Sequence, residues 1–118
     1  MPSETPPHAA LLDIWENIHL AQGFVAGMAY EAFCDNKLVF YAVTRCREII
    51  SEASRRLPVE IKTRHGQIPW ADIAGAGNIY RHNYEDVQQR LVWGTVHDRL
   101  PELLAVVGEE LHGSKDNA

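Results

Sequence analysis

The chain has 118 residues, the length of a single domain that can bury a core of its own. An apolar content of 46% with few prolines and glycines excludes a fibrous or disordered protein. No apolar run could cross a bilayer, and the first eight residues lack the pattern of a signal peptide, so we expect a cytoplasmic protein without membrane contact.

The net charge of −5 is distributed unevenly along the chain. Residues 1–36 carry five acidic side chains and no Lys or Arg, whereas residues 37–65 carry seven basic against three acidic side chains. A general nucleic-acid-binding protein would be basic overall, so any contact with a polyanion must be local. The middle segment and Arg81 could provide it, although a solvated helix face explains most of these bases at least as well.

The cysteines and histidines do not suggest a metal site. Cys34 and Cys46 are the only cysteines, and the six histidines are scattered. A cytoplasmic setting argues against a disulfide, and both thiols occupy positions that look apolar-facing, so we expect them to be buried small side chains. The sequence predicts no metal and no cofactor.

Two long amphipathic helices are expected in the first half of the chain. The first covers residues from about 9 to 33, and Asp35 and Asn36 provide the break after it. Its apolar stripe consists of Leu11, Ile14, Trp15, Ile18, Ala21, Val25, Met28, Ala29 and Ala32. The second runs from about 37 to 57, with Val39, Ala42, Val43, Cys46, Ile49, Ile50, Ala53 and Leu57 inward. Its other faces carry Arg45, Arg47, Glu48, Glu52, Arg55 and Arg56.

The second half predicts shorter helices. Residues 58–66 form a connection that can hold a helical turn, and Pro69 suits the first turn of a third helix, which Trp70 and Ile73 would anchor to the core. Residues 85–87 look like a short connection, and a fourth helical span runs from 88 to about 111, kinked or split by Pro101.

Together these elements predict an all-α fold, an antiparallel bundle of four to five helices. We expect a flexible N-terminus over residues 1–8, a single helical domain over 9–112 and a polar tail over 113–118.

The segment 68–84 holds the best candidate site. If it is helical, Asn78, Arg81 and His82 share one face, and Tyr84 follows closely. His82 can exchange a proton near neutral pH, and Arg81 offers a permanent charge that suits a phosphate. Such a group would fit phosphodiester cleavage by an RNA 2′-hydroxyl, but a surface pair of His and Arg explains the spacing at least as well.

Four sequence blocks resemble the HepT-like family of the HEPN superfamily. They are residues 47–58, residues 68–75, His82-Asn83-Tyr84, and Val92-Trp93 leading to residues 100–104. Their order and spacing fit that family, and the N-terminal helix is compatible, so the resemblance covers nearly the whole chain.

The resemblance implies a HEPN-like helical bundle that forms a homodimer or a higher homo-oligomer, with one cleft built by two protomers. It implies a metal-independent endoribonuclease that cleaves RNA and acts as the toxin of a HepT/MntA-like toxin–antitoxin pair. The antitoxin in that family is a minimal nucleotidyltransferase, which silences the toxin by adding AMP to the motif tyrosine.

The family pattern is Arg, a polar residue, three variable residues, His, one variable residue and Tyr. On this chain His82 matches the His, Tyr84 matches the Tyr and Asn78 matches the polar residue, whereas Gly77 stands where the pattern has Arg. The first hypothesis is therefore a toxin ribonuclease in which His82 transfers a proton or contacts phosphate, Arg81 stabilises phosphate charge, Asn78 orients, and Tyr84 is modified by the partner.

Two other hypotheses stay open at the level of sequence. Gly77 favours a catalytically degenerate HEPN module that dimerises and docks a nucleotidyltransferase partner. The acidic net charge favours a structural helical dimer without any nucleic-acid role, for which no salt-dependent RNA binding is expected.

Overall fold

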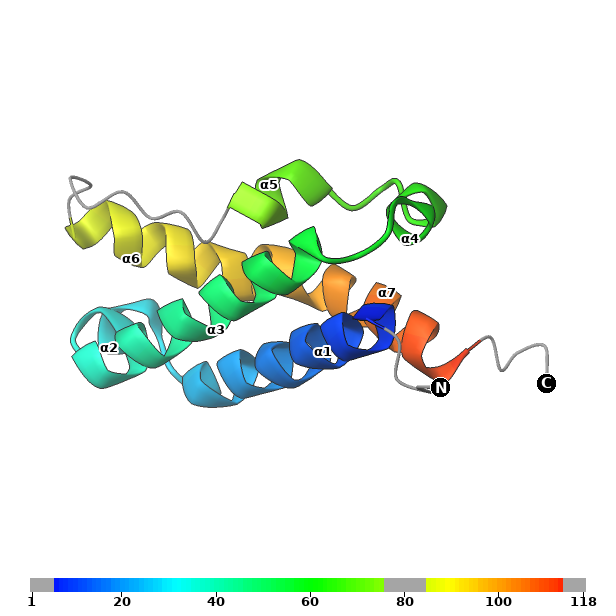
Figure 1. Ribbon diagram of the computed structural model, residues 1–118. Coiled ribbons are helices and arrows are strands. Elements are labelled where there is room, and N and C mark those ends of the chain that lie inside the picture. Colours follow the sequence, from blue (N-terminus) through cyan, green and yellow to red (C-terminus); the bar gives the residue numbers. More distant parts are fainter. Residues whose placement is uncertain (1–5, 76–84, 114–118) are drawn as a thin grey trace.

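The computed structural model describes residues 6–75 and 85–113, which are helical over most of their length (Figure 1). The elements are α1 (Pro6–Val25), α2 (Tyr30–Cys34), α3 (Lys37–Arg55), α4 (Val59–Arg64), α5 (Trp70–Gly75), α6 (Glu85–Gly94), a π-helical turn (Thr95–Arg99) and α7 (Leu100–His112). The described residues contain no strand, so the predicted all-α class is confirmed. None of their helices is long and apolar enough to span a membrane.

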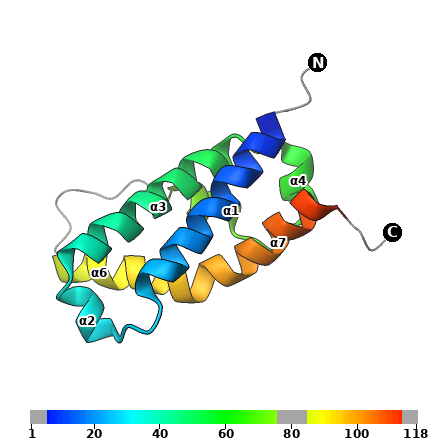
Figure 2. The same ribbon diagram turned by 90° about the horizontal axis from the view of Figure 1, so that it is seen from below.

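The core lies where α1 packs along α3 and α7. Figure 2 shows α1 between these two helices, and it runs antiparallel to both. In contrast, α3 and the helix formed by α6 and α7 point in the same general direction (Figure 1), so the antiparallel arrangement holds for only part of the bundle. The side chains of this core with almost no exposed surface include Ile14, Ile18, Phe33, Val43, Val92, Leu103 and Val107.

The first helix is shorter than the sequence pattern predicts. The expected continuous helix to residue 33 is wrong, because α1 ends at Val25 and Gly27 has a φ of 78°, in the left-handed region that glycine tolerates. A second short helix, α2, then begins at Tyr30 and buries Phe33. Ala29 and Ala32 are exposed, so their apolar spacing did not mark a buried face.

The predicted second helix is confirmed as α3. Asn36 caps it, since its side-chain oxygen accepts a hydrogen bond from the Val39 amide at 3.0 Å. The expected inward residues Val43, Cys46 and Ile50 are buried. The placement of Arg47 on an outer face is wrong, because its side chain is only 9% exposed.

The last helical span begins earlier than expected. Residues 85–87 form the first turn of α6 rather than a connection, and Asp86 lies where a carboxylate favours the positive end of a helix. The predicted disturbance by Pro101 is confirmed: a π-helical turn over Thr95–Arg99 precedes α7, in which Pro101 occupies the first turn. A wider turn accommodates the missing proline N–H without ending the helix.

The predicted short turn after Pro58 is confirmed as α4, which is held against α7. Glu110 in α7 accepts two hydrogen bonds from the guanidinium of Arg64, at 2.9 and 3.0 Å, and its carboxylate lies 2.6 Å from Nε2 of His65. The hydrogen bonds from Arg64, and then that from His65, lower the pKa of Glu110 against the opposing effect of burial. The indole of Trp70 at the start of α5 donates to the carbonyl oxygen of His65 at 3.0 Å.

Candidate functional site

The residues singled out from the sequence, Asn78, Arg81, His82 and Tyr84, lie outside the described residues, as does Gly77. The described chain ends next to this segment at Gly75 in α5 and resumes at the start of α6. The site is therefore built from the elements on both sides of the segment.

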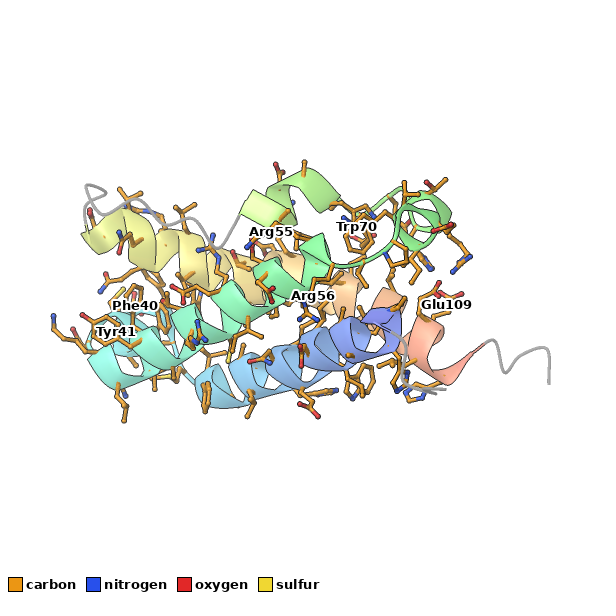
Figure 3. The ribbon with its side chains drawn as sticks, in the orientation of Figure 1. Phe40, Tyr41, Arg55, Arg56, Trp70 and Glu109 are labelled. Carbon is orange, nitrogen blue, oxygen red and sulfur yellow. The ribbon has the colours of Figure 1, made fainter. Side chains whose placement is uncertain are left out.

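The end of α5 is fixed to α3 by two hydrogen bonds to one carbonyl oxygen. The carbonyl of Ala74 accepts from Oγ of Ser51 at 2.6 Å and from Nη1 of Arg55, also at 2.6 Å. Figure 3 shows the Arg55 side chain in the region between α3 and α5. Because Ser51 is fully buried, this contact fixes where the chain leaves α5.

A half-open cavity of about 510 Å³ lies beside the end of α5. Five elements contribute to it: α3, α5, α6, the π-helical turn and the start of α7. Its size is typical of sites for small ligands. The lining residues are Arg47, Ile50, Ala71, Asp72, Ile73, Gly75, Arg90, Leu91, Gly94, Thr95, Asp98, Arg99 and Leu100.

Arg47 lines this cavity, and a hydrogen bond fixes one edge of its guanidinium. Its Nε donates a hydrogen bond to Oγ1 of Thr95 at 3.0 Å. The Thr95 hydroxyl donates its own proton to the carbonyl oxygen of Leu91 at 2.9 Å, so its lone pairs are directed to Arg47. Nη1 of Arg47 is buried and has no hydrogen-bond partner among residues 6–75 and 85–113.

A buried donor without a partner costs about 1–3 kcal/mol, and a charged donor costs more. Burial lowers the pKa of Arg47, although the carboxylate of Glu48 has the opposite effect. A guanidinium nevertheless stays protonated in proteins, because its ordinary pKa lies far above neutrality. Arg47 therefore keeps a charged donor beside the cavity that no described residue satisfies.

Two further arginines and two acids complete the charged lining. Arg99 lies 3.8 Å from the carboxylate of Asp72, and Arg90 lies 3.8 Å from that of Asp86, one turn away on α6. Both distances exceed hydrogen-bond length and both pairs are exposed, so these contacts contribute little and leave the arginines able to turn toward a ligand. Asp98 also lines the cavity, which limits its net positive charge.

A carboxylate pair at Glu48 and Glu52 is a less suitable site. Glu48 accepts a hydrogen bond from Arg45 at 3.2 Å, and Glu52 accepts one from Arg56, also at 3.2 Å. Arg56 reaches Asp13 on α1 as well, at 2.8 Å. These acids are thus neutralised within the helix surface, as the spacing of the sequence indicates.

Comparison with known proteins assigns the chain to a family. The family described as Ribonuclease HepT-like matches residues 14–109. The chain belongs to the HepT-like family. The resemblance inferred from the four sequence blocks is therefore confirmed, and HepT-like membership supports a ribonuclease function.

Relatives of similar length carry related names. The chain is 33% identical over 113 residues to the Methanocaldococcus jannaschii protein named "Putative RNase MJ1216", covering 93% of each. It is 38% identical over 93 residues to "Probable ribonuclease HepT" of Thermococcus cleftensis, covering 79% of this chain and 84% of that protein. No solved structure matches the chain.

The sequence did not single out the three arginines of the cavity. Arg47 follows the buried Cys46, so it is a charged residue at the edge of an apolar stripe. That position was the one sequence signal that could have marked Arg47 as a candidate. Arg90 and Arg99 are nine residues apart, and a π-helical turn interrupts the helix between them. This turn sets the positions of the two side chains relative to each other. Periodicity alone could not bring these residues together with α3.

Proposed function

We propose that this HepT-like protein is a metal-independent endoribonuclease and the toxin of a toxin–antitoxin pair. The observation that carries the proposal is the family match across residues 14–109. The arginine-lined cavity supports it, since it adjoins the point where the chain leaves α5 toward the motif.

The reaction assigned to the site uses the nucleophile within RNA. The 2′-oxygen attacks the adjacent phosphorus, the bond from phosphorus to the 5′-oxygen breaks, and the products are a 2′,3′-cyclic phosphate and a 5′-hydroxyl. His82 accepts the proton of the 2′-hydroxyl or returns one to the leaving 5′-oxygen. Arg81 stabilises the charge on the phosphate, and Asn78 orients His82 or a phosphate oxygen.

The proposal includes a homodimer with a cleft shared by two protomers. Exposed apolar side chains support it: Leu38 is 79% exposed and Tyr41 64% exposed near the start of α3, where Figure 3 shows Tyr41. Val87 is also exposed on α6. Contiguous exposed apolar patches commonly mark an interface, so these side chains are the candidates for it. Light scattering on the wild type is expected to give twice the mass of one chain.

The proposed partner is a minimal nucleotidyltransferase that transfers AMP to the hydroxyl of Tyr84. Co-expression with such a partner is expected to relieve growth inhibition and to add one AMP to the wild-type protein. The Tyr84→Phe variant should stay unmodified, and AMP on that variant would contradict the assignment.

A second candidate function is favoured by Gly77, where the family pattern has Arg. In it the protein is a dimeric module that docks the nucleotidyltransferase without cutting RNA. Expression of the wild type, His82→Ala and Gly77→Arg forms separates the two. Growth inhibition by the wild type and its loss in His82→Ala support the ribonuclease. Inhibition by Gly77→Arg alone supports the binding module.

A further inference from the structure

We propose that the cavity between α3, α5, α6 and α7 binds one RNA phosphate through Nη1 of Arg47, with the attached nucleoside against its apolar wall. This inference rests on the proposed action on RNA. It assigns the substrate contact to described residues outside the motif segment.

The Arg47 side chain is oriented before any ligand binds. Its Nε is occupied by Thr95, whose hydroxyl is itself held by Leu91. A guanidinium fixed in this way keeps its plane and direction without a ligand, so little rotamer freedom is lost when an anion binds. Nη1 is buried behind the cavity surface and unpaired among the described residues, so an incoming phosphate oxygen satisfies this donor once the adjoining wall shifts to admit it.

The cavity carries charges of both signs. Arg47, Arg90 and Arg99 line the cavity together with Asp72 and Asp98. The acids offset most of the positive charge, so the cavity suits a single phosphate rather than a long run of them. The contacts of Arg90 and Arg99 with acids are long and exposed, which lets either one add a second contact to the same phosphate.

The remainder of the cavity is apolar. Ile50, Ile73, Leu91 and Leu100 give it an apolar wall, and about 510 Å³ accommodates a nucleoside as well as its phosphate. A free inorganic anion would leave this wall unused. The cavity therefore fits a nucleotide unit, and its half-open form allows the chain on both sides of that unit to continue into solvent.

The test compares binding of a labelled single-stranded RNA oligonucleotide, AMP and inorganic phosphate to the wild type, Arg47→Met, Arg47→Lys and Arg56→Met. Arg56 is a matched control, because it caps the C-terminal end of the same helix but pairs with Asp13 and Glu52 outside the cavity. We expect Arg47→Met to raise the Kd for RNA about tenfold to a hundredfold. The salt dependence should also become less steep by about 0.7 in slope. Arg47→Lys should be intermediate, and Arg56→Met should bind as the wild type does.

Thermal unfolding separates binding from a structural role. Replacing a buried, unpaired charge by an apolar side chain of similar length should leave the Tm of Arg47→Met unchanged or raise it. Unchanged RNA binding by Arg47→Met would overturn the proposal whatever its Tm, and so would weaker binding that comes only with a strongly lowered Tm. Wild-type binding of AMP or phosphate but not of RNA would overturn RNA as the ligand, and binding of none of the three would overturn the site.

Cleavage measured on the same preparations distinguishes this inference from the proposed function. If the wild type cleaves RNA, and Arg47→Met both binds and cleaves RNA as the wild type does, the inference is refuted and the proposed ribonuclease function is not. Arg47-dependent RNA binding without any cleavage supports the inference and refutes the ribonuclease.

Discussion

The shared hydrogen bonds to Ala74 make a quantitative prediction about how α5 is held. The Ala74 carbonyl oxygen accepts hydrogen bonds from Ser51 and Arg55, and Nη1 of Arg55 also donates to Oγ of Ser51 at 3.1 Å. Because two donors share one acceptor, removing either one leaves the carbonyl bonded. Removing both leaves the end of α5 with no donor from these two residues.

The expected magnitudes follow from this redundancy. A net hydrogen bond contributes about 0.5–1.5 kcal/mol, whereas an unpaired buried group costs about 1–3 kcal/mol. Ser51→Ala and Arg55→Met should therefore each lower the free energy of unfolding by about 1 kcal/mol or less. The double variant should lose about 2–3 kcal/mol, more than the sum of the two, because it also leaves the half-buried Ala74 carbonyl without either donor.

Urea unfolding gives these free energies, and hydrogen exchange of the α5 amides shows whether the loss is local. Ser54→Ala is the matched control: Ser54 is also buried in α3, but its hydroxyl donates at 2.7 Å to the carbonyl of Ser51 within the same helix. It should leave exchange in α5 unchanged. Strictly additive losses from Ser51→Ala and Arg55→Met, or faster α5 exchange in Ser54→Ala, would refute the reasoning.

Two further predictions concern the helices around α7. A Cβ on Gly108 would lie 2.8 Å from the indole of Trp15, so Gly108→Ala should destabilise by about 1 kcal/mol in urea unfolding, despite the better helix propensity of Ala. Gly23→Ala, with nothing within 4 Å, should instead stabilise by up to about 1 kcal/mol, and equal effects of the two would contradict this packing. Arg64 lowers the pKa of Glu110, so the contact stabilises the fold above the ordinary carboxyl range and is lost as pH falls through the lowered value. The stability difference between the wild type and Glu110→Gln, followed by thermal unfolding, should thus be large at neutral pH and shrink in acid, and a difference independent of pH would argue against the pair.

Local signals predicted α3 well and the end of α1 poorly. At Asn36 the capping side chain and the start of a strong apolar stripe coincide, so the sequence and the structure agree. After Val25 the small apolar residues Ala29 and Ala32 continued the spacing although Gly27 had already ended the helix. Small side chains fit a periodic pattern without requiring burial, which is why the pattern misled.

The candidate site depended on packing between distant segments. Arg47 and Thr95 are 48 residues apart, and their hydrogen bond forms only because α6 and the π-helical turn cover that side of α3. No spacing within α3 distinguishes Arg47 from the exposed Arg45 two residues earlier. The family, in contrast, could be predicted from ordered sequence blocks, because these blocks are local.

The most direct test of a HepT-like ribonuclease is the fate of RNA and of DNA of the same sequence in the presence of EDTA. Each oligonucleotide is incubated with the wild type and with His82→Ala, and the products are identified by mass spectrometry. The His97→Ala variant is the control, since His97 is an exposed histidine outside the cavity lining. We expect the wild type and His97→Ala to cut RNA into fragments that end in a 2′,3′-cyclic phosphate and to leave DNA intact. We expect His82→Ala to cut neither RNA nor DNA. RNA that stays intact with the wild type, or that His82→Ala cuts equally well, would contradict the account.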